Sequence, residues 1–103
     1  MEDSKLLQGK VGNEIGKNIK RRINQLLSAK NFYEYLTVLR YGCPHSLNGE
    51  LKGCYALSVS PNYRLIVKPN SDNFDMEGFK IVKEIYIEGV VDYHGRKYEW
   101  IIP

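Results

Sequence analysis

The spacing of apolar residues changes about one third of the way along the chain, and this change restricts the fold more than any other feature. In the first third, apolar residues recur every three or four positions: Val11, Ile15, Ile19, Ile23, Leu26 and Leu27. This spacing predicts an amphipathic helix over about residues 13–29. A shorter helical stretch, residues 32–39, follows the turn at Lys30-Asn31, so this third predicts a helical hairpin.

The middle of the chain has the two-residue period of β-strands. Residues 54–60 alternate between larger apolar side chains and small ones, which predicts a half-buried strand. Pro61-Asn62 favours a turn, and residues 63–67 alternate in the same way, so the two segments predict a β-hairpin. Arg64 falls on the face of its strand opposite to the apolar residues.

The last third predicts a loop, a third strand and a short apolar end. Residues 69–79 are mainly polar, and residues 80–91 are rich in Ile, Val and Tyr, with Gly89 marking a bulge. Residues 100–102 either add an edge strand or dock on the core. Helices followed by antiparallel strands predict an α+β fold. We expect an N-terminal helical hairpin packed on one face of a small curved antiparallel sheet, whose other face is free for a substrate.

The composition is that of one globular domain spanning residues 1–103. Hydrophobic residues make up 43% and charged residues 26%, as in ordinary globular proteins. A chain of 103 residues is too short to form two domains that each bury a sufficient hydrophobic core. No apolar run approaches the ~20 residues of a membrane span, and none of signal-peptide length follows the N-terminus, so we expect a cytoplasmic protein with no membrane partner. The net charge of +3 permits an RNA partner without requiring one. Cys43 and Cys54 are expected to be reduced thiols.

Three places carry side chains suited to proton transfer or phosphate binding. Asp92-Tyr93-His94 puts a carboxylate, a phenol and an imidazole at the end of the third strand, beside the free face of the sheet. His45 lies in a turn-rich segment before the first strand. Arg64 points away from the core, where a guanidinium can meet a phosphate bidentately. Each also has a plainer interpretation, a polar strand end for either histidine and a surface ion pair for Arg64.

Two segments carry a family resemblance. The first runs from His45 to Val67 and reads HSLNGELKGCYALSVSPNYRLIV, and the second is Val91-Asp92-Tyr93-His94. In this order and spacing, and after a helical hairpin, they resemble the HigB-type toxins (plasmid-maintenance killer proteins) of the RelE/ParE superfamily. The resemblance implies a RelE-like fold and cleavage of messenger RNA on the ribosome, with no metal or cofactor. It also implies neutralisation by a HigA-like helix-turn-helix antitoxin, through which alone the toxin meets DNA.

Carried over position by position, the resemblance implies an active site made of His45, Arg64, Asp92, Tyr93 and His94. Further RNA contacts are expected from a second set: Asn48, Lys52, Lys68, Arg96 and Lys97. Two positions depart from the family pattern, because Asn48 replaces a lysine of many relatives and Ser60 replaces a basic residue of some. Lys52 or Lys68 would have to compensate. The short strand that precedes the first helix in relatives is not evident in this sequence.

Metal-free RNA cleavage needs a base for the ribose 2′-hydroxyl, a cation for the charged phosphorane, and an acid for the leaving 5′-oxygen. Histidine suits either proton transfer because its pKa lies near neutrality. We expect one of His45 and His94 to act as base and the other as acid, with Arg64 on the phosphate. Asp92 would orient an imidazole or act as the base itself, and Tyr93 would stack on a base or position the 2′-hydroxyl.

Several alternatives stay open. A ParE-like toxin shares the superfamily but poisons DNA gyrase by binding, and it would not need the two histidines. A zinc site is disfavoured because its candidate ligands have irregular spacing: Cys43, His45, Cys54 and His94. Residues 12–17 resemble a phosphate-binding P-loop, but the spacing between their glycines is one residue short of that motif and no strand precedes them, so we discard this alternative. The eight tyrosines would also suit an interaction module without chemistry, since tyrosine is favoured at interfaces.

Overall fold

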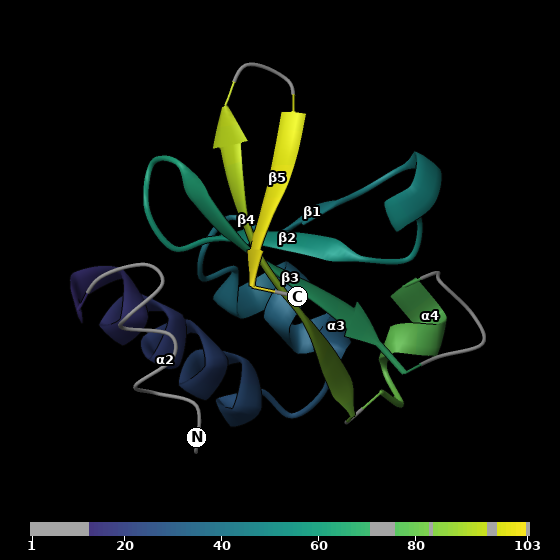
Figure 1. Cartoon of the computed structure of the whole chain (residues 1–103). Helices are drawn as coiled ribbons and strands as arrows, with labels where there is room; N and C mark the ends of the chain where they lie inside the picture. The colour runs from purple at the N-terminus through teal and green to yellow at the C-terminus, as the bar shows by residue number, and fades with distance from the viewer. Residues whose placement is uncertain (1–12, 71–75, 83, 95–96, 103) are drawn as a thin grey trace.

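The fold combines a few helices with one antiparallel sheet. A computed structural model of the chain describes residues 13–70, 76–82, 84–94 and 97–102. In chain order the elements are α2 (Asn13–Ser28), α3 (Phe32–Glu34), the π-helical turn η1 (Tyr35–Leu39), β1 (His45–Ser46), the 3-10 turn η2 (Gly49–Leu51), β2 (Tyr55–Ser58), β3 (Tyr63–Pro69), α4 (Met76–Phe79), β4 (Ile85–His94) and β5 (Lys97–Ile102). The predicted α+β class is confirmed (Figure 1).

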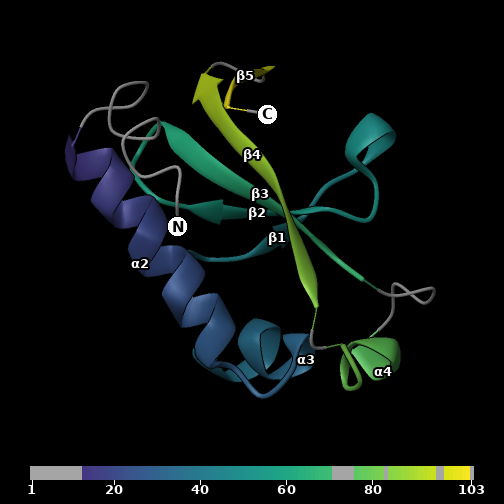
Figure 2. The same ribbon diagram turned by 60° about the horizontal axis from the view of Figure 1, so that its bottom comes forward.

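The two predicted helical stretches are present. Ile19, Ile23 and Leu26 of α2 are buried, whereas Leu27, which the periodicity assigned to the same stripe, is 74% exposed. The short α3 begins with a side-chain cap, because Asn31 Oδ1 accepts a hydrogen bond from the Glu34 backbone N–H at 2.8 Å. The turn η1 ends where Arg40 adopts a left-handed conformation with φ of 51°. Figure 2 shows α2 and α3 along the same side of the sheet.

The sheet is a curved meander in which each strand pairs antiparallel with its neighbour in the sequence, in the order β1-β2-β3-β4-β5. The predicted hairpin is β2 and β3. The structure differs from the prediction in several elements. Residues 45–46 form the edge strand β1, the short helix α4 lies within the predicted loop, and β4 begins at residue 85 instead of 80. Of the two alternatives for residues 100–102, the edge strand is confirmed, since β5 covers them.

Two bulges set which side chains share a face. In β4, Gly89 lies opposite Ile66 while Ile87 lies opposite Val67, so Glu88 is the extra residue. Gly89 has a φ of 149°, and the bulge predicted there is confirmed. In β5, the register with β4 also shifts by one residue, and Ile101 is the extra one. Each bulge reverses the alternation of the residues beyond it.

The sheet has a different cluster of buried side chains on each face. The helix-covered face packs on α2, α3 and η1 through the main cluster, which contains Ile19, Ile23, Leu26, Phe32, Tyr35, Leu36, Leu57, Val59, Leu65, Val67, Phe79, Val82 and Val90. The opposite side, here called the open face, has only a small cluster of Leu47, Cys54, Ala56, Ile66 and Val91. Within the residues described, no helix is both long and apolar enough to cross a membrane.

Candidate functional site

Arg64 and Tyr93 meet on the open face. Arg64 pairs across the sheet with Val91, a member of the open-face cluster, as the alternation along β3 predicts. The guanidinium carbon of Arg64 lies 5.6 Å from the centre of the Tyr93 ring, which is a cation–π distance. The antiparallel register produces this contact. Tyr93 lies two residues after Val91 on β4, so its side chain points to the same face and is a diagonal neighbour of Arg64 on β3.

Within the described part of the chain, the hydrogen bonds of the Arg64 guanidinium all come from one nitrogen, Nη1. Its Nη1 donates to the backbone carbonyl oxygens of the β2–β3 turn: Ser60 at 2.9 Å, Tyr63 at 3.1 Å and Pro61 at 3.2 Å. These bonds hold the side chain in one orientation. Among the described residues, the other two guanidinium nitrogens have no hydrogen-bond partner, so they can donate to an anion above the open face.

Asp92 lies on the other side of the sheet from Tyr93. It pairs with Tyr63 of β3 and with Glu99 of β5, and Tyr63 packs against the main cluster on the helix-covered face. Consecutive residues of a strand point to opposite faces, so the carboxylate and the phenol of this motif are separated by the sheet. Because Asp92 lies near the end of β4, a substrate held on the open face would have to extend around that end of the strand to contact its carboxylate.

Three predicted residues lie wholly or partly outside the described part of the chain. The backbone of His94 closes β4 and pairs with Lys97, the first residue of β5. The side chains of His94 and Lys97, and the whole of Arg96, lie outside the described residues. Their part in a site therefore stays a prediction.

His45 is remote from the Arg64–Tyr93 pair. It is exposed on β1 opposite Ala56, and β1 and β3 are separated by β2, so their backbones are about 10 Å apart. It also lines an open pocket of about 520 Å3 together with Leu36, Arg40, Pro44, Ser46 and Tyr55. Asn48 is exposed three residues after His45, directly before the 3-10 turn η2. The structure does not bring His45 or Asn48 into contact with Arg64.

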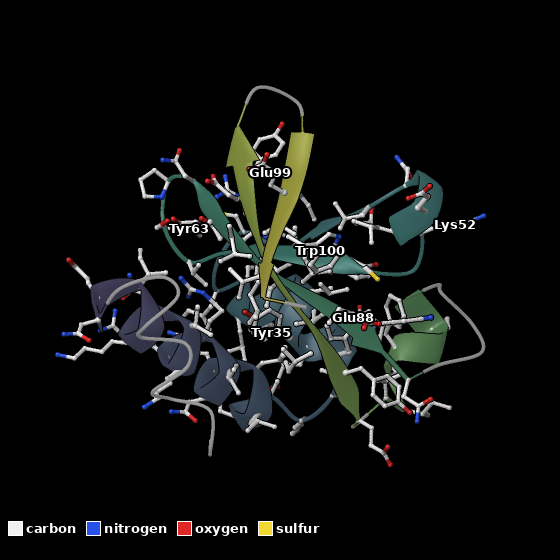
Figure 3. The ribbon with its side chains drawn as sticks, viewed as in Figure 1. Tyr35, Lys52, Tyr63, Glu88, Glu99 and Trp100 are labelled. Carbon is white, nitrogen blue, oxygen red and sulfur yellow. The ribbon has the colours of Figure 1, made fainter. Side chains whose placement is uncertain are left out.

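A second pocket of about 300 Å3 opens on the same face as Arg64, and we call it the Trp100 pocket. Its lining residues are Glu50, Leu51, Lys52, Cys54, Lys68, Glu88 and Trp100. Two predicted RNA-binding residues, Lys52 and Lys68, thus share one pocket. Figure 3 shows Trp100 of β5 and Glu88 of β4 on the sheet, and Lys52 at the outer edge beside η2.

Sequence reasoning missed Trp100 as a candidate functional residue. The signal was present in the alternation of Tyr98 and Trp100 with Glu99 and Ile101, which is typical of a strand with one aromatic face. The side to which that aromatic face points depends on the pairing of β5 with β4, in which Trp100 lies opposite Val91 of the open face.

The floor of the Trp100 pocket has low polarity. Cys54 is buried, and this burial raises the pKa of its thiol above the usual value. The nearby Glu88 carboxylate raises this pKa further, whereas the Lys68 ammonium lowers it. The thiol is therefore a neutral, weakly polar surface, with a carboxylate and an ammonium close enough to influence it.

Metal binding finds no support among the described residues. In that part of the chain no group of three or more His, Cys, Asp or Glu side chains is placed to hold a metal ion. Cys43 is exposed, Cys54 is buried, and both are free thiols. The four-residue zinc alternative includes the His94 imidazole, which lies outside the described residues.

The open face therefore offers an oriented guanidinium in cation–π contact with a phenol, and beside it a pocket with an indole wall, two lysines and two glutamates. Such a surface can bind a phosphodiester and an aromatic heterocycle together. Comparisons of the chain with models of known protein families, with curated proteins and with solved structures find no match.

Proposed function

We propose that the chain is a HigB-type toxin with a RelE-like fold, a metal-independent endoribonuclease that cleaves messenger RNA on the ribosome. It acts in the cytoplasm and is kept inactive by a HigA-like helix-turn-helix antitoxin. The observation that carries the proposal is the cation–π pair of Arg64 and Tyr93 on the open face. Both residues belong to the two segments that resemble this family, and they lie together although 29 positions separate them in the sequence.

In the proposed reaction the 2′-oxygen of a ribose attacks the adjacent phosphorus and displaces the 5′-oxygen of the next nucleotide. A base takes the proton of the 2′-hydroxyl, and an acid gives a proton to the leaving 5′-oxygen. The two free nitrogens of Arg64 donate to the phosphate oxygens as negative charge develops on them. The products are a 2′,3′-cyclic phosphate and a free 5′-hydroxyl.

The proton transfers are assigned to the histidines, with His94 at the end of β4 and His45 on β1. Tyr93 holds a base or the 2′-hydroxyl beside the guanidinium. Asp92 orients an imidazole or takes the proton itself. Because His45 and Arg64 are separated by β2, the substrate has to cross β2 to meet both. A messenger held in a fixed path by the ribosome meets this requirement better than a free RNA does.

The test is induced expression in bacteria, with growth and messenger RNA 5′-ends read for the natural chain and three variants. We expect growth arrest with new ends inside translated codons. His94→Ala should lower cleavage by ~100-fold or more, as expected when a general acid or base is removed. Arg64→Gln should lower it by a similar factor, since it removes the cation that stabilises the developing charge. The control is Arg21→Gln, an exposed arginine on α2, which should cleave normally.

Two results contradict the proposal. Arrest without new RNA ends, unaffected by His94→Ala, indicates a non-enzymatic toxin of the ParE kind. Absence of arrest indicates that the chain is not an active nuclease, and the departures at Asn48 and Ser60 are then the first positions to restore to the basic residues of relatives.

A further inference from the structure

The residues that line the Trp100 pocket are apolar, aromatic, basic and acidic side chains together, a mixture typical neither of a phosphate-binding site nor of a cavity in an apolar core. One wall is the indole of Trp100, which is 44% exposed, and the floor is formed by Leu51 and the buried Cys54. The rim carries two lysines and two glutamates: Lys52, Lys68, Glu50 and Glu88. We infer that this pocket binds one unpaired base of a single-stranded RNA, stacked on Trp100. The inference rests on the proposed RNA substrate and adds to it a subsite that selects the base.

The charge balance of the rim favours a base over a phosphate. Two ammonium and two carboxylate groups sum to no formal charge, so the pocket lacks the excess of positive charge that attracts an anion. A base is uncharged and has both donors and acceptors on its edge. The Glu88 carboxylate can accept from an exocyclic amino group, and the Lys68 ammonium can donate to a ring nitrogen or carbonyl oxygen.

The size of the pocket is consistent with a single base. A volume of about 300 Å3 lies at the lower end of the range for small-molecule sites. Stacking on an exposed indole tolerates every base, because every base has a π-face. The choice among bases is therefore left to the polar rim, where donors and acceptors of both kinds are present.

Strand pairing and one bulge place two side chains of this pocket. Trp100 pairs with Val91 on the open face, in the same unbroken register that begins with the pairing of His94 and Lys97, so the indole is turned to the open face. The bulge in β4 makes Glu88 the extra residue opposite Ile66, and Glu88 lines the pocket from there. Bulges commonly re-aim a side chain beside a functional site.

The pocket lies next to the Arg64–Tyr93 pair on the same face. Arg64 and Trp100 are the two cross-strand neighbours of Val91, one on β3 and the other on β5. Lys68 is four residues from Arg64 along β3, which corresponds to about 13 Å of strand. A single strand of RNA running along β3 would meet Arg64 with a phosphate and place a nearby base in the pocket.

Trp100 is the one tryptophan of the chain, so its fluorescence reports on the pocket directly. The experiment titrates the purified full-length protein with short single-stranded RNA homopolymers of each base at low salt. We expect saturable quenching whose midpoint differs between bases. In parallel, the anisotropy of labelled RNA measures total binding, and Trp100→Leu should weaken it by about tenfold or more through the loss of stacking.

Two rim variants test the polar part of the pocket. Lys68→Gln and Glu88→Gln should change the ranking of the four homopolymers, because each alters the donors and acceptors that meet the base edge. Lys30→Gln is the matched control, since it removes an exposed lysine beside α3 on the helix side of the molecule. The control should leave both the midpoints and their ranking unchanged. Circular dichroism of every variant verifies that the fold is retained.

The outcomes separate this inference from the proposed function. RNA binding by anisotropy without any change in Trp100 fluorescence overturns the pocket and leaves the nuclease proposal intact. Equal quenching by inorganic phosphate alone also overturns it, because the pocket would then take anions instead of bases. Base-dependent quenching by a protein that produces no new RNA ends in cells supports the pocket and contradicts the nuclease proposal.

Discussion

The two faces of the sheet are built from alternate residues of the same strands, yet they are used differently. Leu65 and Ile66 are neighbours on β3, and both are fully buried. Leu65 joins the main cluster beneath α2 and α3, whereas Ile66 joins the small cluster of the open face. The polar residues beside them differ too, because Arg64 and Lys68 both accompany Ile66 on the open face.

This difference shows how a small protein can separate stability from binding. The helix-covered face removes most of the apolar surface from water, which is the main source of folding free energy. The open face keeps enough buried surface under Arg64 and Trp100 to hold the strands in place, and leaves polar and aromatic groups exposed. Substitutions on the two faces should therefore have different consequences.

The largest difference is expected between Leu65→Ala and Ile66→Ala. Each deletes a fully buried side chain, but only the cavity at Leu65 is enclosed by helices and sheet together. We expect Leu65→Ala to lower the free energy of unfolding by about 4 kcal/mol and Ile66→Ala by about 2 kcal/mol. Urea unfolding measures both. An Ile66→Ala loss equal to or larger than that of Leu65→Ala would mean that the two faces contribute alike.

A second, smaller contrast concerns two glycines with positive φ. Gly42 (φ of 78°) lies against α2, where an added Cβ would be 2.8 Å from Arg22 Nε and 3.0 Å from the Ser58 carbonyl oxygen. Gly49 (φ of 66°) lies in η2, where an added Cβ meets nothing within 4 Å. We expect Gly49→Ala to cost only the ~1 kcal/mol of left-handed backbone strain.

Gly42→Ala should cost about 1–2 kcal/mol more, since it also displaces the hydrogen bond that Arg22 Nε donates to the Ser58 carbonyl oxygen at 3.0 Å. Thermal unfolding of both variants measures the difference. Equal costs would show that α2 can shift to accommodate a methyl group, and that the helix-covered face is less rigid than its burial indicates.

A further contrast appears only at alkaline pH. Burial raises the pKa of Tyr35, on the helix-covered face, to about 12, with Arg22 lowering it and Tyr41 raising it. Because the folded-state pKa is raised, the stabilisation is complete below pH 10 and is lost as the pH rises from 10 to 12. Urea unfolding between pH 8 and pH 11.5 should show this loss in the natural chain and less of it in Tyr35→Phe.

Cys54 is the open-face counterpart. Its thiol pKa is also raised, chiefly by burial, from a usual value of 9.0, so its stabilisation starts to fall at a lower pH than that of Tyr35. Cys54→Ala should therefore flatten the stability profile just above pH 9, where Tyr35→Phe has no effect. Identical profiles for the two variants would contradict the assigned pKa directions.

The sequence predicts those parts of the fold that depend on local period. Ile19 and Ile23 predict α2 because their spacing matches one side of a helix, and the alternation of β2 and β3 predicts their hairpin and the outward direction of Arg64. The predicted start of β4, at residue 80, was wrong. The apolar run that includes Val82 has the composition of a strand and was therefore counted as part of it. Val82 instead packs into the main cluster just before β4 begins.

The site depends on register, which no local pattern specifies. The sequence predicts that Arg64 and Tyr93 are site residues, but their contact follows from the pairing of β3 with β4. It likewise assigns Asp92 and Tyr93 to one motif, and only the sheet shows that they point to opposite faces. Trp100 was missed because its side depends on the pairing of β5 with β4, which sets Trp100 opposite Val91, and a single-residue shift in register leaves the composition of a strand unchanged.

The meander order of the strands also fixes when each surface forms. Every strand pairs with the one made just before it, so no strand has to wait for a distant segment. Apart from residues 70–84 between β3 and β4, the connections between paired strands are short, which keeps the loss of chain entropy on pairing small, a pattern associated with rapid folding. During synthesis the helices and the β2–β3 hairpin emerge first and β5 last. We therefore expect the pocket wall carried by Trp100 to be the final part of the open face to assemble.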